Sequence, residues 1–103
     1  MNKIIKFNVG GKKYMTTTDT LNKAPESLLV IWANEYSNNI INVDRDGPSF
    51  RYILNYLRDL SKWTPPNDVD ILSQLILEAN YYGLDKLKAR LEELRNNLIE
   101  EKK

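Results

Sequence analysis

The side chains that most often carry catalysis are missing from this sequence. Its 103 residues include no histidine and no cysteine, which removes the commonest general base and a common nucleophile. Asp44 and Asp46 flank an arginine and lack the further oxygen ligands that a calcium loop requires. Gly10-Gly11-Lys12 lacks the glycine spacing of a phosphate-binding loop. We therefore predict no catalytic residue, no cofactor and no metal site, and keep an enzyme only as an alternative of a different functional class.

The chemistry that the sequence does offer is that of a charged and aromatic contact surface. Asp44, Arg45 and Asp46 alternate in sign, so one short turn can make bidentate arginine–carboxylate contacts. Two arginines, two tyrosines and an asparagine follow it outside the apolar stripe of a predicted helix: Arg51, Tyr52, Asn55, Tyr56 and Arg58. The aromatics would supply affinity, since an exposed ion pair contributes only about 0.2–1 kcal/mol. The alternative interpretation is an ordinary helix with solvated charges.

The stretch from Val43 to Arg58 positions this surface. Gly47 permits a sharp turn, Pro48 suits the first turn of a helix, and Asp46 or Gly47 can cap that helix. Apolar residues then recur at the i, i+3, i+4, i+7 spacing: Phe50, Ile53, Leu54 and Leu57. We predict a helix whose apolar stripe enters the core and whose second face stays accessible.

The N-terminal residues have the pattern of a β-hairpin. Ile5, Phe7 and Val9 alternate with polar residues, as in a half-buried strand. Gly10-Gly11 then provides two residues that adopt positive φ without cost from a side chain. With that two-residue loop Phe7 lies opposite Tyr14, and the aromatic pair joins Ile5 on the buried face.

Three further elements are predicted between the hairpin and the charged turn. Oxygens of residues 18–20 cap a short helical turn before Leu21, and Pro25 begins a second helix. That second helix is apolar on more than one side, which favours a central core helix, with burial against another protomer as the alternative. Residues 34–39 are polar and predict a loop, and Ile40–Val43 predicts a short strand.

The second half of the domain is predicted to be mainly helical. Residues 59–68 contain two adjacent prolines and predict a loop with at most a short edge strand at Lys62–Thr64. Asp68 or Asn67 can cap a helix with an apolar stripe, and Gly83 ends it as a left-handed residue.

The C-terminal segment repeats leucine at coiled-coil spacing. Its seam contains five residues: Leu84, Leu87, Leu91, Leu94 and Leu98. In a parallel coil of identical chains Arg90 would face Arg95, so we expect the first leucines to pack on the domain's own core. The end would then fray, meet a different partner or continue into a longer protein, and an Arg90–Glu93 pair would support the helix. We assign residues 1–83 to the domain and 84–103 to this helix.

Composition limits the class of protein. The net charge is +1, which gives no field that would attract nucleic acid or an anionic membrane. The longest apolar run, Leu28–Ala33, is too short to span a bilayer, and the N-terminus has no signal-peptide pattern. The absence of cysteine fits a reducing compartment. We expect one cytoplasmic domain that binds neither nucleic acid nor membrane.

Four motifs occur in order along the chain: NVGGKKYMTT, the pair Thr20-Leu21, VDRDGPSFRYILNYLR and LEANYYGL. Together they resemble a BTB/POZ domain of the type found in voltage-gated potassium-channel tetramerisation domains and in KCTD proteins. The similarity runs from about Ile5 to Leu91. Any one motif alone would be weak, but their joint occurrence at family spacing is specific.

The resemblance implies a compact α+β fold in which helical hairpins cover a small sheet made from the N-terminal hairpin and one further strand. It also implies self-assembly into a homotetrameric or homopentameric ring. The interface would contain the charged turn and the second face of the following helix: Asp44, Arg45, Asp46, Arg51, Tyr52, Asn55, Tyr56 and Arg58. Some potassium-channel relatives bridge subunits with zinc through cysteines and a histidine, which this sequence lacks.

The implied function is that of a KCTD-type adaptor or scaffold, with a cullin ubiquitin ligase as a candidate partner. The cytoplasmic assembly domain of a voltage-gated potassium channel is the alternative, and the lack of zinc ligands favours the adaptor. Two departures from the family affect contacts made by loops, including a cullin-binding surface. The segment before Ile40 is short, and Asp59-Leu60 stands where the family often has a glycine.

Overall fold

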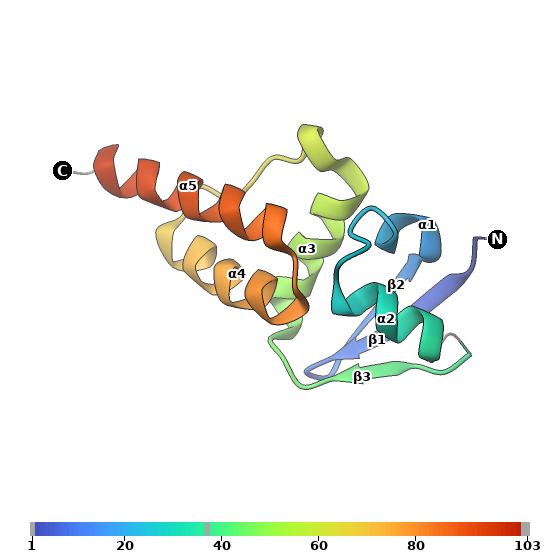
Figure 1. Ribbon diagram of the computed structural model, residues 1–103. Coiled ribbons are helices and arrows are strands. Elements are labelled where there is room, and N and C mark those ends of the chain that lie inside the picture. The colour runs from blue at the N-terminus through green and yellow to red at the C-terminus, as the bar shows by residue number, and fades with distance from the viewer. Residues whose placement is uncertain (1, 37, 102–103) are drawn as a thin grey trace.

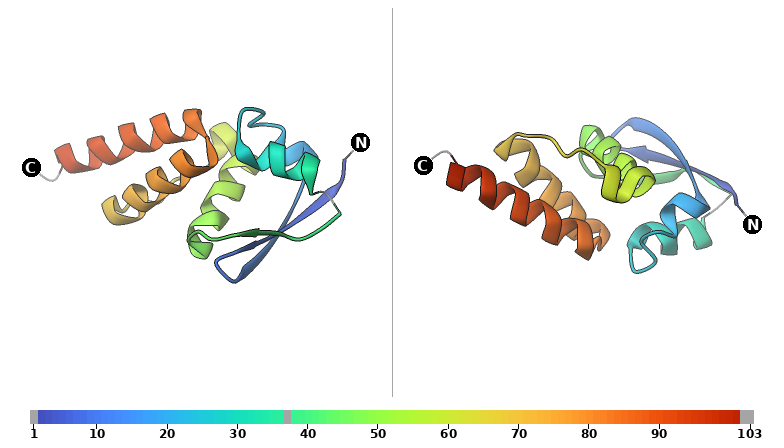
Figure 2. Two further views of the ribbon diagram at one scale, coloured as in Figure 1. Left: turned by 60° about the horizontal axis from the view of Figure 1, so that its bottom comes forward. Right: turned by 90° about the horizontal axis from the view of Figure 1, so that it is seen from above.

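The computed structural model describes residues 2–36 and 38–101 of a mixed α+β fold. The elements in chain order are β1 (Ile4–Val9), β2 (Lys12–Thr17), α1 (Thr18–Leu21), α2 (Leu28–Glu35), β3 (Ile41–Val43), α3 (Gly47–Asp59), the 3-10 helix η1 (Leu60–Lys62), α4 (Val69–Tyr82) and α5 (Asp85–Glu101). Helices α1, α2 and α3 pack against one face of a three-stranded sheet, and α4 and α5 form a hairpin that extends away from it (Figure 1). The described ends of the chain lie at opposite ends of the molecule (Figure 2).

The sheet has the strand order β2-β1-β3, with β1 antiparallel to β2 and parallel to β3. Phe7 pairs with Tyr14 as predicted, and φ is +55° at Gly10 and +93° at Gly11. Positive φ at both loop residues matches the twist of the flanking strands, which is why this glycine pair makes a tight hairpin. The predicted hairpin and its register are confirmed.

Phe50 of α3 packs against the sheet on one side and against α4 on the other. Its side chain is fully buried, and its ring centroid lies 5.1 Å from that of Phe7, 5.3 Å from that of Tyr14 and 5.4 Å from that of Tyr82. The rest of the predicted α3 stripe is also buried: Ile53, Leu54 and Leu57. Tilted and edge-on ring contacts of this kind stabilise a core beyond the apolar area that they bury.

Helix boundaries follow the predicted capping residues in the second half of the chain. Asp46 is the N-cap residue of α3 and accepts a hydrogen bond from the Ser49 backbone N–H at 3.2 Å. Asp68 caps α4 in the same way through Ile71 N at 3.0 Å, and Gly83 ends α4 in the left-handed conformation with φ +74°. These capping residues were sufficient to predict the helix boundaries, because each one satisfies backbone groups that the helix leaves unpaired.

The predicted short helix at Leu21 forms as α1 (Thr18–Leu21), but its predicted cap and the predicted start of α2 are wrong. The hydroxyl of Thr17, and not an oxygen of residues 18–20, caps α1 by accepting the Thr20 N–H at 3.3 Å. Helix α2 begins at Leu28, and Pro25 lies in the preceding turn, which is closed by the hydrogen bond from Ser27 N to Ala24 O at 3.1 Å. Pro25 occupies the second position of that turn, where its fixed φ is favoured as much as at a helix start.

Helix α2 packs against the core but keeps an exposed side, so the predicted central core helix is also wrong. Leu29 and Ala33 are buried, whereas Ile31 is 47% exposed. The helix runs further than predicted, to Glu35, and shortens the predicted loop 34–39, of which Ser37 lies outside the described residues.

The predicted edge strand at Lys62–Thr64 does not form. Residues 60–68, all of which the structure describes, contain the short helix η1 and irregular backbone but no strand. Trp63 is buried at 6% exposure and packs edge-on against Tyr56, with ring centroids 5.5 Å apart. Burial of this indole, rather than pairing with the sheet, fixes the segment.

Helix α5 packs along α4. Leu84, Leu87 and Leu91 are buried as expected, and Leu94 and Leu98 are half-buried against the same core. The leucine seam therefore has a partner within the chain up to the last described turns. The predicted end of the segment, residues 102–103, lies outside the described residues. No helix among residues 2–36 and 38–101 combines the length and apolar character needed to cross a bilayer.

Arg90 anchors α5 to the segment after α3 instead of pairing with Glu93. Its guanidinium donates to Leu60 O at 3.3 Å and to Trp63 O at 3.2 Å, and lies 5.4 Å from the centroid of the Trp63 ring. Leu60 itself has φ +49° and ψ −114°, a conformation that favours glycine. Leu60 belongs to the pair Asp59-Leu60 that stands where the resemblance implies a glycine, and the leucine there is strained.

Replacing Leu60 with glycine should therefore stabilise the protein. We expect Leu60→Gly to raise the free energy of unfolding by about 1 kcal/mol, because relief of strain exceeds the loss of a partly exposed side chain. Leu60→Ala is the matched control, since it removes the same side chain and keeps the strained φ. Urea unfolding of both variants checks this, and equal stability of the two would contradict the assignment of strain.

Candidate functional site

The tip of the β-hairpin holds the charged turn in place. A Cβ atom on Gly10 would lie 2.4 Å from the Arg45 carbonyl oxygen, and one on Gly47 would lie 2.6 Å from Val9 O. The Gly10 N–H also donates to Val43 O at 2.9 Å. Both glycines are therefore required by close approach of two backbones. The turn is built against the hairpin and is not a free loop.

Arg45 makes a bidentate ion pair with Glu78 of α4. Arg45 Nε lies 2.9 Å from Glu78 Oε1, and Nη2 lies 2.8 Å from Oε2. The Glu78 side chain is 1% exposed and that of Arg45 is 30% exposed. Gln74 Nε2 donates to Glu78 Oε2 at 2.6 Å, and the Arg45 guanidinium lies 4.6 Å from the centroid of the Tyr81 ring. The hydrogen bonds from Arg45 to Glu78 raise the pKa of Arg45, so its guanidinium stays charged.

The two aspartates of the turn have different environments. Asp46 accepts hydrogen bonds from the backbone and from the hydroxyl of Ser49, so its carboxylate completes the start of α3. Asp44 is exposed. Tyr14 supports the same helix start by donating from its hydroxyl to Gly47 O at 2.6 Å, and partial burial raises the pKa of Tyr14.

The outer face of α3 combines exposed charge with half-buried aromatic rings. Arg51 is exposed and Tyr52 is half-buried, and both line a hollow of about 420 Å³ with Asn55 and Trp63. Arg58 lies at the end of the face and donates to Asn55 Oδ1 at 3.2 Å and to Met15 O at 3.0 Å. The side chains therefore form a surface of aromatic rings bordered by cations.

The structure divides the predicted site residues into two groups. Arg45, Asp46 and Arg58 already have partners within the chain, whereas Asp44 and Arg51 make no side-chain hydrogen bond or ion pair within residues 2–36 and 38–101. Among those same residues, no three acidic, histidine or cysteine side chains are grouped closely enough to hold a metal ion. The arrangement can bind a protein surface through charge and aromatic contact.

Sequence reasoning missed Glu78 as the partner of Arg45. The signal was present, because Glu78 lies three residues after Leu75 and four before Tyr82, on the buried stripe of α4. A carboxylate on such a stripe requires a cation or hydrogen-bond donors, since an unpaired buried charge is costly.

Tyr82 lies beside this pair in the core. Its side chain is fully buried, and its hydroxyl has no hydrogen-bond partner within the described part of the chain. Burial, together with the negative charge of Glu78, raises the pKa of Tyr82 above its usual range. The phenol is held neutral in the folded protein.

Comparison with known proteins gives a consistent result. A sequence profile of the BTB/POZ domain matches residues 5–92. The FH protein interacting protein FIP2 of Arabidopsis thaliana is 34% identical over an alignment 110 positions long, which covers 97% of this chain and 36% of that protein. The BTB/POZ domain-containing protein KCTD21 of human and of mouse is 38% identical over 95 aligned residues, which cover 86% of this chain and 36% of each relative. The chain thus spans about a third of the length of these curated relatives.

We expect substitutions of the two partners of the ion pair to lower the free energy of unfolding by different amounts. Arg45→Gln leaves the buried Glu78 charge without its cation and should lower the free energy of unfolding by about 3–5 kcal/mol. Glu78→Gln should cost about 1–2 kcal/mol, because Arg45 is partly exposed and can turn to water. Urea unfolding of both variants and of the double variant checks this. Equal costs, or costs that add in the double variant, would contradict the pairing.

We expect the buried phenol of Tyr82 to make the folded protein less stable at high pH. The unfolded chain releases the phenol proton near pH 10 whereas the folded protein retains it, so stability is present below that pH and falls above it, by about 1.4 kcal/mol per pH unit. Tyr82→Phe should be at least as stable at pH 7, since a buried unpaired hydroxyl is removed, and should lose less stability between about pH 9 and 11. Because Tyr14 is common to both proteins, the difference between their unfolding curves isolates Tyr82. The same pH dependence of the free energy of unfolding in both proteins would contradict the role assigned to Tyr82.

Proposed function

Because this chain belongs to the BTB/POZ domain family, whose members are protein–protein interaction domains, we propose that it assembles copies of itself into a ring of four or five subunits. The contact in this proposal contains the charged turn and the outer face of α3. The observation that carries the proposal is the pair of unpartnered charges, Asp44 and Arg51, beside the half-buried rings of Tyr52 and Tyr56. Interfaces use partly buried aromatics and arginine for affinity, with charge at the rim for orientation.

The charges favour a head-to-tail contact over a symmetric one. If two copies met through α3 alone, Arg51 and Arg58 would face the same cations on the other copy. A head-to-tail arrangement joins two different faces and closes into a ring when the rotation between neighbours divides a full turn. Rings of four and of five differ by a small rotation between similar interfaces, and the proposal includes both.

The fixed geometry of the corner supports this role. Arg45 and Asp46 tie the turn to α4 and to the start of α3, so the exposed side chains beside them are presented by ordered backbone. A surface that is already ordered loses less conformational entropy on association. Within the proposed interface, Arg45 and Asp46 therefore orient the contact, and Asp44, Arg51 and Tyr52 meet the neighbour.

We extend the proposal to the role of an adaptor or scaffold of KCTD type. The shared region is about a third of each relative, which suits an assembly module joined to other segments that bind clients. A cullin is the candidate partner that the family resemblance offers. Binding of a purified cullin N-terminal fragment to this protein, measured by calorimetry, tests that part, and no binding would leave a pure assembly module.

Charge reversal tests the ring without removing the internal contacts. We expect wild-type protein to have four or five times the 12.0 kDa mass of one chain, by native mass spectrometry and light scattering. Asp44→Arg combined with Arg51→Glu reverses both charges at the proposed contact and should shift the population to single chains. The fold should be unaffected, because neither side chain contributes a hydrogen bond or ion pair within the described chain.

Glu100→Arg is the matched control, since it reverses an exposed charge in the last turn of α5, far from the sheet (Figure 1). Its mass should equal that of the wild type, and circular dichroism should be the same for all three proteins. A wild type of single-chain mass would refute the ring. An unchanged mass in the double variant would refute this interface.

A further inference from the structure

One face of the sheet is not covered by any helix. Residues alternate along each strand, so the face opposite α3 contains Lys6 and Asn8 from β1, Lys13 and Met15 from β2, and Asn42 from β3. All five are exposed or half-exposed, whereas the residues between them are part of the core or packed against it. We call these five residues, with Ile4 and Ile40, the open sheet face.

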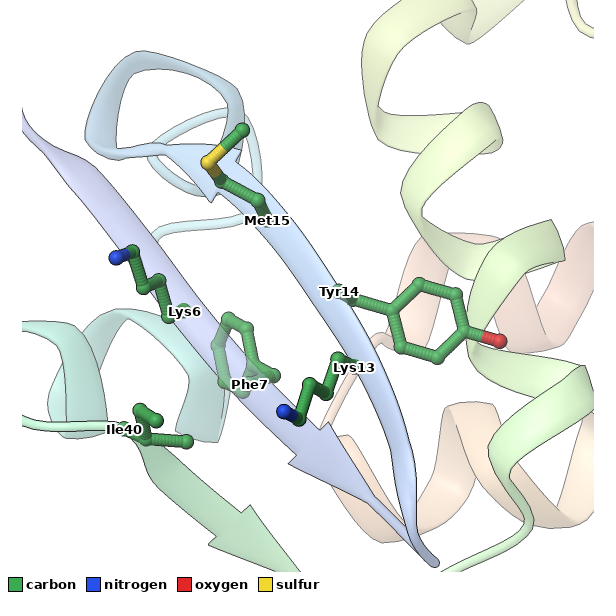
Figure 3. Close-up of a pocket in the computed structure, with 6 residues that line it drawn as sticks. All are labelled: Lys6, Phe7, Lys13, Tyr14, Met15 and Ile40. Atoms are coloured by element: carbon green, nitrogen blue, oxygen red, sulfur yellow. The ribbon is translucent and has the colours of Figure 1, made fainter.

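Three large apolar side chains of the open sheet face are exposed to solvent. Ile4 is 58% exposed, Met15 is 58% exposed and Ile40 is 52% exposed. A hollow of about 250 Å³ lies here, lined by Lys6, Phe7, Lys13, Tyr14, Met15 and Ile40 (Figure 3). The side chain of Tyr14 points from the strand toward α3, so the outer wall of the hollow comes from the methionine, the isoleucine and the two lysines.

The charge of this face has one sign. Lys6 pairs with Met15 and Lys13 pairs with Asn8, which puts the two lysines in diagonal positions on neighbouring strands. None of the three strands carries a carboxylate, and neither ammonium group has a hydrogen bond or ion pair within residues 2–36 and 38–101. The face therefore offers two cations beside an apolar hollow.

We propose that the open sheet face binds an acidic segment of another protein, in which carboxylates alternate with large apolar side chains. The carboxylates pair with Lys6 and Lys13, and the apolar side chains enter the hollow beside Met15 and Ile40. Charge complementarity selects this occupant. The inference does not depend on the ring.

A second copy of this chain fits the same face poorly. Two open sheet faces in contact would bring lysines against lysines, and the outer face of α3 is also cationic through Arg51 and Arg58. Like charges placed in contact cost free energy and disfavour that partner. Neither cationic face of a second copy is complementary to the open sheet face, and the proposal commits to a different protein with carboxylates of its own.

The test uses the full chain and a synthetic nine-residue peptide in which aspartate alternates with leucine. The ε-methyl group of Met15 is a direct probe, because the sequence contains only one other methionine. We expect its NMR signal to shift on titration, with affinity that falls as salt is raised. A peptide with asparagine in place of aspartate should bind at least about tenfold more weakly, which corresponds to about 1.4 kcal/mol.

Two variants separate the contributions of charge and apolar contact. Lys6→Glu combined with Lys13→Glu should abolish binding of the aspartate peptide, and Ile40→Ser should weaken it while leaving the salt dependence. Lys86→Glu, an exposed charge on α5, is the control and should bind as the wild type does. Equal binding of the two peptides, or unchanged binding by the double variant, would refute the proposal. A fall in oligomer mass in the double variant would assign the face to self-assembly and would also refute it.

Discussion

The buried charge of Glu78 is the constraint on which the corner of this molecule depends. A carboxylate at 1% exposure on an apolar helix face is unfavourable unless a cation and hydrogen-bond donors reach it. Gln74 provides one donor, and Arg45 provides the cation from the turn between β3 and α3. The helical hairpin is thereby tied to the sheet by a polar contact of defined geometry, and the turn cannot move without exposing that charge.

The same turn is constrained from its other side by the hairpin. Gly10 and Gly47 lie where a Cβ atom would collide with backbone carbonyl oxygens, so the strand loop and the helix start are in direct contact. Phe50 follows within the same segment and packs on rings from β1, β2 and α4. Backbone contact, ion pair and aromatic packing therefore converge on fewer than ten consecutive residues. The motif that identifies the family is also the segment that joins its layers.

Much of this fold could be predicted from sequence because its signals are local. Alternation of apolar and polar residues predicted β1, and the glycine pair predicted the register of the hairpin. Helix ends were predicted from the caps Asp46 and Asp68 and from Gly83. Prediction failed where one local signal fits two structures. Pro25 has the same fixed φ at a helix start and in a turn, and only the Ser27–Ala24 hydrogen bond distinguishes them. It also failed where tertiary packing decides, as for the burial of Trp63.

The candidate site was predictable to a similar extent. Periodicity was enough to expect Tyr52 and Arg51 outside the apolar stripe, because a helix has one buried face. The partner of Arg45 could not be read from spacing, since Glu78 lies 33 residues away. The positive φ at Leu60 was likewise not predicted from the sequence. Long-range pairing and backbone strain are properties of the folded chain that a one-dimensional pattern records only indirectly.

The net charge of +1 conceals a separation of charge that bears on partner choice. None of the 14 carboxylates lies on a strand, whereas three lysines do, and half of the carboxylates lie on α4 and α5. A field that is weak at long range can therefore be strongly positive over the sheet. Arg45 is paired with Glu78 inside the chain, whereas the outer face of α3 and the open sheet face each keep an exposed cation without an internal partner, Arg51 on the first and Lys6 and Lys13 on the second. Two such faces on one small domain allow assembly and recruitment to use different surfaces, and an acidic segment bound to the sheet would leave the α3 face unobstructed.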